Sequence, residues 1–252
     1  MRTTLLSSFA AITLAACASG QAEAPKGTIA DPYQDFNRSA FAFNQGLDKY
    51  AIEPVAKTYG AVTPSFLRDR VGDFSRNLGE PVTFVNSALQ GEGTRASDTV
   101  FRFIMNSTIG LLGIWDPAEK VGVPAHKEDF GQTLAVWGVP SGPYLVLPFL
   151  GPSNPRDALA RVVDQAFQPL TWTEFESDDD LDTYIMVGSA VLSGLNTRLA
   201  LDEQIKTLNS QPEPYVALRR IYTSQRDSAI RNGEVDEETV YDDLPDFDEF
   251  EE

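Results

Sequence analysis

Apolar side chains recur every three to four residues after Asp31-Pro32, which is the spacing of one face of an α-helix. Aspartate is a common N-cap residue, and proline is favoured in the first helical turn. The pattern predicts an amphipathic helix that runs to about residue 51 and is unusually rich in phenylalanine. Its apolar positions are Phe36, Ala40, Phe41, Phe43, Leu47, Tyr50 and Ala51.

Similar periodicity predicts further helices along most of the chain, each bounded by proline, glycine or a capping residue. A break between two of them is placed at Glu80-Pro81, because proline disrupts helix interiors. The fold class is therefore mostly α. The predicted helices cover residues 63–78, 80–89, 94–105, 154–167, 181–208 and 212–232.

Two apolar stretches lack a helical pattern. Residues 138–155 contain eight glycines and prolines with apolar side chains between them, which predicts irregular, partly buried backbone or a short strand at Tyr144–Leu147. Residues 109–115 are apolar but contain Gly110 and Gly113. Backbone of this kind packs inside a protein or lines a cavity.

The N-terminus has the layout of a secretory signal peptide. Arg2 precedes a short apolar run that ends in Leu14-Ala15-Ala16-Cys17, which is similar to the bacterial lipobox. Residues 1–16 are predicted to be cleaved, leaving Cys17, the sole cysteine of the chain, as a lipidated N-terminus. The alternative is an ordinary signal peptide with a chance cysteine. Residues 17–30 are small and polar and predict a flexible tether, and Ala18, rather than aspartate, favours the outer membrane.

The chain is acidic, and the acid is concentrated at its end. It has 20 basic and 37 acidic residues, and residues 234–252 contain eleven aspartates and glutamates with no lysine or arginine. This balance excludes binding to a nucleic-acid backbone. The segment is predicted to be a disordered solvating tail or, alternatively, a docking segment for a basic partner. Its docking candidates are Tyr241, Phe247 and Phe250.

An enzymatic function is not supported by the residues. His126 is the sole histidine, so a nucleophilic triad or a common zinc site lacks its usual members. No G-x-S-x-G elbow occurs in the sequence. We predict a protein that is not an enzyme and that uses neither a metal nor another cofactor.

Several segments resemble the MlaA (VacJ) family of outer-membrane phospholipid-transport lipoproteins. They recur in the family's order and extend over residues 31–233, which are predicted to form one domain. The matching segments are Asp31–Arg38, Phe41–Asn44, Glu80–Gly91, Arg102–Gly110, Asp129–Leu134, Trp137-Gly138, Gly142–Tyr144, Leu147-Pro148, Gly151–Ser153 and Arg156-Asp157.

The resemblance implies a compact ring of amphipathic helices embedded in one leaflet of the outer membrane and facing the periplasm. Such a protein removes mislocalised phospholipid from the outer leaflet through an amphipathic channel, and so maintains lipid asymmetry. It hands the lipid to a periplasmic carrier of the MlaC type, and a porin trimer commonly holds it in place. A structural lipoprotein that scaffolds the envelope is the alternative from another class.

A lipid channel needs a polar side for the headgroup and an apolar wall for the acyl chains. Asn37, Arg38, Asn44 and Arg102 are headgroup candidates, because each stands among aromatic residues. Helix capping, hydrogen bonds between helices or, for Arg102, a buried ion pair are the alternatives. The candidates for the wall are Phe43, Trp115, Tyr144, Leu147 and Phe149.

Overall fold

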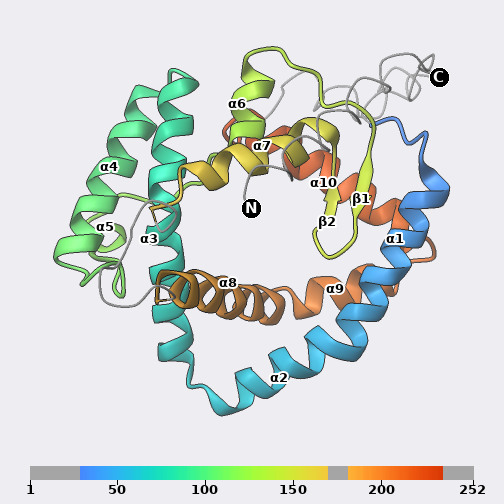
Figure 1. The fold of residues 1–252 in the computed structure, drawn as a ribbon, viewed down its shortest axis with the longest axis horizontal. Helices are drawn as coiled ribbons and strands as arrows, with labels where there is room; N and C mark the ends of the chain where they lie inside the picture. The colour runs from blue at the N-terminus through green and yellow to red at the C-terminus, as the bar shows by residue number, and fades with distance from the viewer. Residues whose placement is uncertain (1–28, 170–180, 235–252) are drawn as a thin grey trace, which may run out of the picture.

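The computed structural model describes residues 29–169 and 181–234. Its helices follow one another around a ring, and the turn of a small two-stranded sheet points toward the middle of that ring (Figure 1). The predicted fold class, mostly α with a short β segment, is confirmed. Within the described residues, no helix combines the length and the apolar character needed to cross a bilayer.

The first helix continues well beyond its predicted end and forms a curved arm along one side of the ring (Figure 1). The arm consists of α1 (Gln34–Leu47), a π-helical turn η1 (Asp48–Ile52) and α2 (Glu53–Val62). Pro54 has no backbone N–H to donate to the Tyr50 carbonyl, and the wider π turn lies directly before it. Proline therefore changes the pitch of this helix without ending it.

The predicted break at Glu80-Pro81 is wrong, because α3 (Ser65–Leu89) passes through Pro81 as one helix. Proline removes a single helical hydrogen bond, and α3 packs closely against α4 (Gly93–Thr108). Glu80 is buried in that contact. Tertiary packing thus outweighs the local preference for a break.

The glycine- and proline-rich segment contains the sheet, in which Leu145 lies opposite Ser153 and Leu147 opposite Gly151. Two short helices, α5 and α6, were not predicted from periodicity, and the single helix predicted for 181–208 is divided at Leu201. The remaining elements are α5 (Pro117–Lys120), α6 (Phe130–Val136), β1 (Leu145–Leu147), β2 (Gly151–Ser153), α7 (Pro155–Ala166), α8 (Leu181–Ala200), α9 (Asp202–Asn209) and α10 (Pro214–Ile230).

Arg198, near the end of α8, links α8 and α9 to the curved arm through hydrogen bonds. Its Nε and Nη2 donate to the two carboxylate oxygens of Asp48 at 2.6 and 3.0 Å, and its Nη1 donates to Asp202 at 2.8 Å. These hydrogen bonds raise the pKa of the buried guanidinium above its usual value, the bond to Asp48 most strongly. α8 and α9 are thereby held across the ring (Figure 1).

The interior of the ring protein is polar and its surface is apolar, a distribution we call inverted polarity. Among the described residues, nine hydrophobic side chains are buried, whereas nineteen polar or charged side chains are buried. Thirty-four large hydrophobic side chains are exposed. A protein folded in water buries most of its large hydrophobic side chains and exposes most of its charged ones.

Arg102 of α4, the largest fully buried side chain among the described residues, connects α4 to α3 and to the residues on either side of α5. Its Nε donates to Glu80 at 2.9 Å, its Nη2 to Asp116 at 2.6 Å and its Nη1 to the Val123 carbonyl at 2.6 Å. Burial raises the pKa of Glu80. Burial also acts to raise the pKa of Asp116, but hydrogen bonds from Arg102 and the Glu119 amide lower it overall. One guanidinium therefore compensates two buried carboxylates.

We expect Arg102→Met to destabilise the fold by about 3–5 kcal/mol, because it leaves Glu80 and Asp116 buried without their shared cation. Denaturant unfolding in detergent measures the change. Arg161→Met, at an exposed position of α7, is the matched control and should stay within about 0.5 kcal/mol of wild type. Equal unfolding midpoints for the two variants would contradict the role of Arg102 as the cation that stabilises the two buried carboxylates.

Candidate functional site

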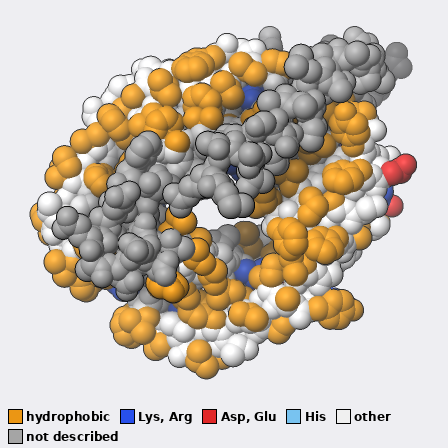
Figure 2. Space-filling view, viewed as in Figure 1, with side chains coloured by type: hydrophobic (Ala, Val, Ile, Leu, Met, Phe, Trp, Pro, Cys, Tyr) orange, Lys and Arg blue, Asp and Glu red, His pale blue; other side chains and the backbone are white. Residues whose placement is uncertain are grey.

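An opening passes through the middle of the molecule (Figure 2). α7 and the hairpin lie on one side of it and α8 on the other (Figure 1). Hydrophobic side chains cover much of the face around the opening (Figure 2). A ring with apolar side chains on the face around its opening can accept a molecule that carries long apolar chains.

Two asparagines on α1 hold the hairpin in place. Asn37 donates from Nδ2 to the Tyr144 carbonyl at 2.9 Å and accepts at Oδ1 from the Val146 amide at 2.8 Å. Asn44, two helical turns later on the same face, repeats this pattern. It donates to the Leu147 carbonyl at 3.0 Å and accepts from the Phe149 amide at 2.8 Å. The two side-chain amides thus pair with the edge of β1 as a neighbouring strand would.

The turn of the hairpin presents apolar side chains. Phe149 has a φ of 67° and is 72% exposed. Its ring meets the Phe43 ring edge-to-face, with centroids 5.2 Å apart. A positive φ is unfavourable for a bulky residue, and here the two hydrogen bonds of Asn44 fix the backbone around it. Phe43, Asn44, Leu147 and Phe149 are therefore brought together at one place, beside the opening.

At the other end of the hairpin, Tyr144 belongs to the core. It is fully buried, its ring packs against Tyr215 and Tyr222, and burial raises the pKa of its hydroxyl. Asp31 closes this end, accepting hydrogen bonds from Tyr215 and Asn37 and from Arg219 at 3.1 Å. Tyr144 thus supports the hairpin from behind.

The four predicted headgroup contacts have different surroundings. Asn37 is fully buried, and both the oxygen and the nitrogen of its side-chain amide are hydrogen-bonded within the fold. Arg102 is fully buried and forms ion pairs with Glu80 and Asp116. Each residue therefore has the structural role that was the alternative to headgroup binding. Asn44 is half-buried and bonded to the hairpin. Arg38 is exposed, lies 4.6 Å above the Tyr215 ring and pairs with Glu213. Asn37 and Arg102 are not available to a headgroup.

Trp115 lies apart from the hairpin, at the end of a loop beside α3 and α4. In this loop Leu111 and Leu112 have φ values of 51° and 60° and are 58% and 70% exposed. Gly113, also at positive φ, leaves no room for a side chain, because a Cβ there would lie 2.3 Å from Asn77 Cβ. The glycines of residues 109–115 indicated unusual backbone, but not the outward direction of the leucines.

The remaining predicted residues, Cys17, Tyr241, Phe247 and Phe250, lie outside the described residues. So do the predicted signal peptide, the first part of the tether and all of the acidic tail after Glu234.

His126 lies in a buried polar cluster rather than in a cleft. Its Nε2 is 3.1 Å from Thr99 Oγ1 and 3.4 Å from Ser87 Oγ. Burial, reinforced by nearby Arg95, lowers its pKa to about 4, so the ring is neutral at pH 7. Ser87 is fully buried and out of reach of a substrate. Within the described part of the chain, no group of three His, Cys, Asp or Glu side chains is placed to hold a metal ion.

We expect Asn37→Ala to destabilise the protein by about 2–4 kcal/mol, because it leaves the Tyr144 carbonyl and the Val146 amide without partners in a buried region. Denaturant unfolding tests this. Asn209→Ala removes one exposed hydrogen bond, to Gln45, and should have an effect of less than about 0.5 kcal/mol. A loss of stability of the same size for both variants would contradict a stabilising role for the hydrogen bonds between Asn37 and the hairpin.

Comparison with known proteins places this geometry in a family. The family described as MlaA lipoprotein matches residues 29–229. The intermembrane phospholipid transport system lipoprotein MlaA of Escherichia coli (strain K12) is 31% identical over 228 residues, which cover 86% of this chain and 88% of that protein. An uncharacterized protein of Rickettsia felis is 36% identical over 205 residues, covering 81% and 79% of the two chains.

A solved structure from work on the structural basis for maintenance of bacterial outer membrane lipid asymmetry has the same fold. It superimposes with a TM-score of 0.71 at 30% sequence identity, covering 80% of this chain and 99% of that one. The sequence match and the shared ring extend over nearly all of the described residues. The chain therefore belongs to the MlaA lipoprotein family.

Proposed function

We propose that this protein is an outer-membrane lipoprotein that removes mislocalised phospholipid from the outer leaflet through its central opening. The observation that carries the proposal is the inverted polarity of a ring built around that opening. Apolar side chains on the outer surface suit a ring embedded in one leaflet, and an apolar opening suits acyl chains. The names of the E. coli relative and of the structural neighbour, which concern phospholipid transport and lipid asymmetry, agree with this role.

The proposal includes an anchor and two partners. Cys17 carries the lipid anchor, and the body of the protein faces the periplasm. A porin trimer holds the ring in the membrane, and a periplasmic carrier of the MlaC type collects the lipid. Because the ring moves lipid without a chemical step, net flux follows the partners that remove it. The acidic tail after Glu234 would steer the encounter with a basic carrier.

We expect deletion of the gene to raise surface phospholipid, measured with an acylation reaction that acts only on the outer leaflet. The wild-type gene should restore the normal level, whereas Cys17→Ala should not, because it removes the anchor. If the envelope becomes fragile while surface phospholipid stays unchanged, the protein is a structural lipoprotein instead. Restoration by both forms would contradict the role of the anchor.

Embedding in the leaflet predicts that the 109–115 loop contacts acyl chains. A variant carrying Trp137→Phe and Trp172→Phe retains Trp115 as its single tryptophan. We expect its fluorescence to be quenched in vesicles whose lipids carry brominated acyl chains, relative to unbrominated vesicles. Leu112→Asp in the same background should reduce the quenching, because a carboxylate in hydrocarbon costs about 3 kcal/mol. Equal fluorescence in the two kinds of vesicle would contradict the embedding of this loop.

A further inference from the structure

Arg161, on α7, is an exposed cation that makes no hydrogen bond and no ion pair within the described part of the chain. Two carboxylates lie within its reach along the same helix, Asp157 one turn before it and Asp164 one turn after it. Both are engaged elsewhere. Asp157 accepts a hydrogen bond from the Tyr222 hydroxyl at 3.0 Å, and Asp164 accepts one from the Asn86 side chain at 2.9 Å. The guanidinium of Arg161 is therefore left without a counterion.

The direction of Arg161 follows from the residue one turn later. Gln165 comes four residues after Arg161 and so lies on the same face of α7. Its Nε2 is 3.9 Å from the Met186 Sδ of α8. Arg156 and Ala160, on another side of α7, are buried. Because α7 and α8 lie on the two sides of the opening (Figure 1), the face that carries Arg161 is directed toward the opening.

The surroundings of Arg161 on α7 are apolar. Leu159 and Val162 are 53% and 72% exposed, and Arg161 is the one exposed charged residue of this helix. When acyl chains fill the opening they exclude water, and an unpaired guanidinium then costs free energy until an anion pairs with it. This position of the opening therefore favours a ligand that carries a negative charge beside its hydrocarbon chains.

The predicted headgroup contacts leave this role open. Asn37 and Arg102 are fully buried and bonded within the fold. Asn44 is bonded to the hairpin, and Arg38 is paired with Glu213 at 3.2 Å. None of the four is a cation without a counterion, which is what Arg161 offers.

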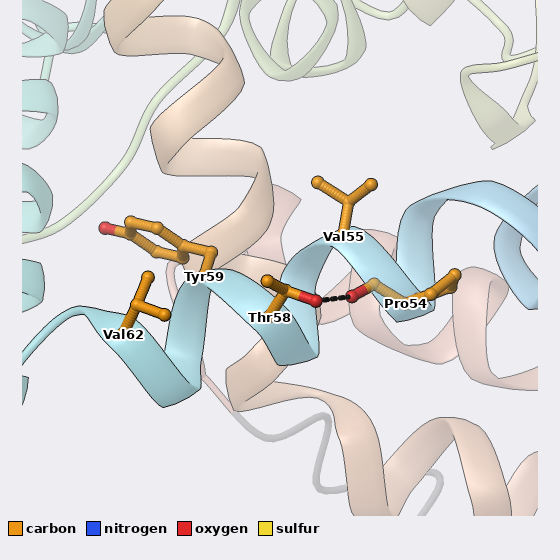
Figure 3. Close-up of a pocket in the computed structure, with 5 residues that line it drawn as sticks. All are labelled: Pro54, Val55, Thr58, Tyr59 and Val62. Atoms are coloured by element: carbon orange, nitrogen blue, oxygen red, sulfur yellow. Dashed lines mark hydrogen bonds between the residues drawn. The ribbon is translucent and has the colours of Figure 1, made fainter.

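A groove on α2 also suits an acyl chain, but its lining has no cation for a phosphate. The groove has a volume of about 380 Å³. The Thr58 hydroxyl donates to the Pro54 carbonyl of the same helix at 2.8 Å (Figure 3). The lining residues are Pro54, Val55, Thr58, Tyr59 and Val62 (Figure 3). A phosphate is thus better accommodated beside Arg161 than in this groove.

We propose that Arg161 binds the phosphate of a phospholipid in the opening, while the acyl chains lie against the hairpin turn. A guanidinium binds phosphate through two parallel hydrogen bonds, and the phosphate is common to all glycerophospholipids. The contact therefore selects for the phosphodiester and not for the headgroup beyond it. This inference rests on the proposed function, and it names the residue that holds the charged end of the lipid.

Photolabelling of the full mature protein in detergent tests the contact. The probe is phosphatidylglycerol with a diazirine on one acyl chain, and mass spectrometry follows labelling of the hairpin around Phe149. We expect the probe concentration for half-maximal labelling to rise about tenfold in Arg161→Gln, because a charged hydrogen bond is lost. Maximal labelling should stay the same. Since Arg161 has no partner within the described fold, the variant should also keep the wild-type unfolding midpoint.

Arg220→Gln is the matched control. Arg220 is an exposed cation of α10, and it comes two residues before Tyr222, whose ring packs against Tyr144 of the hairpin segment. Residues two apart lie on nearly opposite faces of a helix, so Arg220 points away from the hairpin. Removing its charge should leave half-maximal labelling unchanged. An equal shift for both variants would reflect net charge and would overturn the contact at Arg161.

Two further arms identify what is bound. Diacylglycerol with the same diazirine lacks the phosphate, so its half-maximal labelling should be equal in wild type and Arg161→Gln. If Arg161→Gln weakens labelling by diacylglycerol as well, the arginine acts on the shape of the opening and the proposal fails. If inorganic phosphate prevents labelling by the lipid probe as well as unlabelled phosphatidylglycerol does, the site binds free phosphate and the lipid proposal also fails.

The remaining outcomes separate this proposal from the proposed function. Equal half-maximal labelling by the phosphatidylglycerol probe in wild type and Arg161→Gln, with the hairpin labelled in both, would leave the transport role intact and overturn the contact at Arg161. Absence of hairpin labelling in the wild-type protein would overturn the transport role as well.

Discussion

Hydrogen bonds among buried polar side chains hold this protein together, and the rest of the structure depends on them. With apolar side chains turned outward, few are left to form an interior, so the helices meet through ion pairs and amides. Arg198 and Arg226 join elements that are distant in the sequence, and Arg102 joins the consecutive helices α3 and α4. Such contacts are directional, and they are stronger where water is excluded. A scaffold of this kind can keep its shape in surroundings where the hydrophobic effect supplies little force between helices.

The same constraint explains how a ring can keep an open middle. A globular protein closes over its core because its largest side chains attract one another there. In the part of this chain that the structure describes, the largest fully buried side chains are Arg102, Tyr144, Tyr215 and Glu128, and their partners lie at the junctions between elements. The α1–α2 arm is held at Asp48, the hairpin at Asn37 and Asn44, and the α3–α4 pair at Arg102. The contacts that stabilise the fold thus lie around the circumference of the ring.

Periodicity, capping residues and the cluster of glycine and proline were sufficient to predict most helices and the position of the short strand. They failed where tertiary contacts override a local rule, as at Pro81, where packing against α4 carries α3 through. They also could not assign the phenylalanines. Phe36, Phe43, Phe66 and Phe101 are exposed, because an amphipathic pattern shows which residues share a face but not which medium that face meets.

The candidate site was predictable in part. Polar residues among aromatics marked Asn37, Asn44 and Arg102 as unusual, but the sequence contains no information on whether their partners are lipid or backbone. Phe43, Asn44, Leu147 and Phe149 were predicted only as separate channel candidates; they come from two short segments about a hundred residues apart, and the sequence did not show that these segments meet at the hairpin turn.

The hydrogen bonds from Asn37 and Asn44 to the edge of β1 have a consequence for any molecule that moves past the hairpin. An unpaired strand edge is adhesive, since its open amides and carbonyls recruit other strands or bind polar groups firmly. On the α1 side of this hairpin, the groups at Tyr144, Val146, Leu147 and Phe149 are already occupied by the side chains of Asn37 and Asn44. A molecule in transit meets rings and methyl groups there, and it can slide along the wall without exchanging hydrogen bonds at each step.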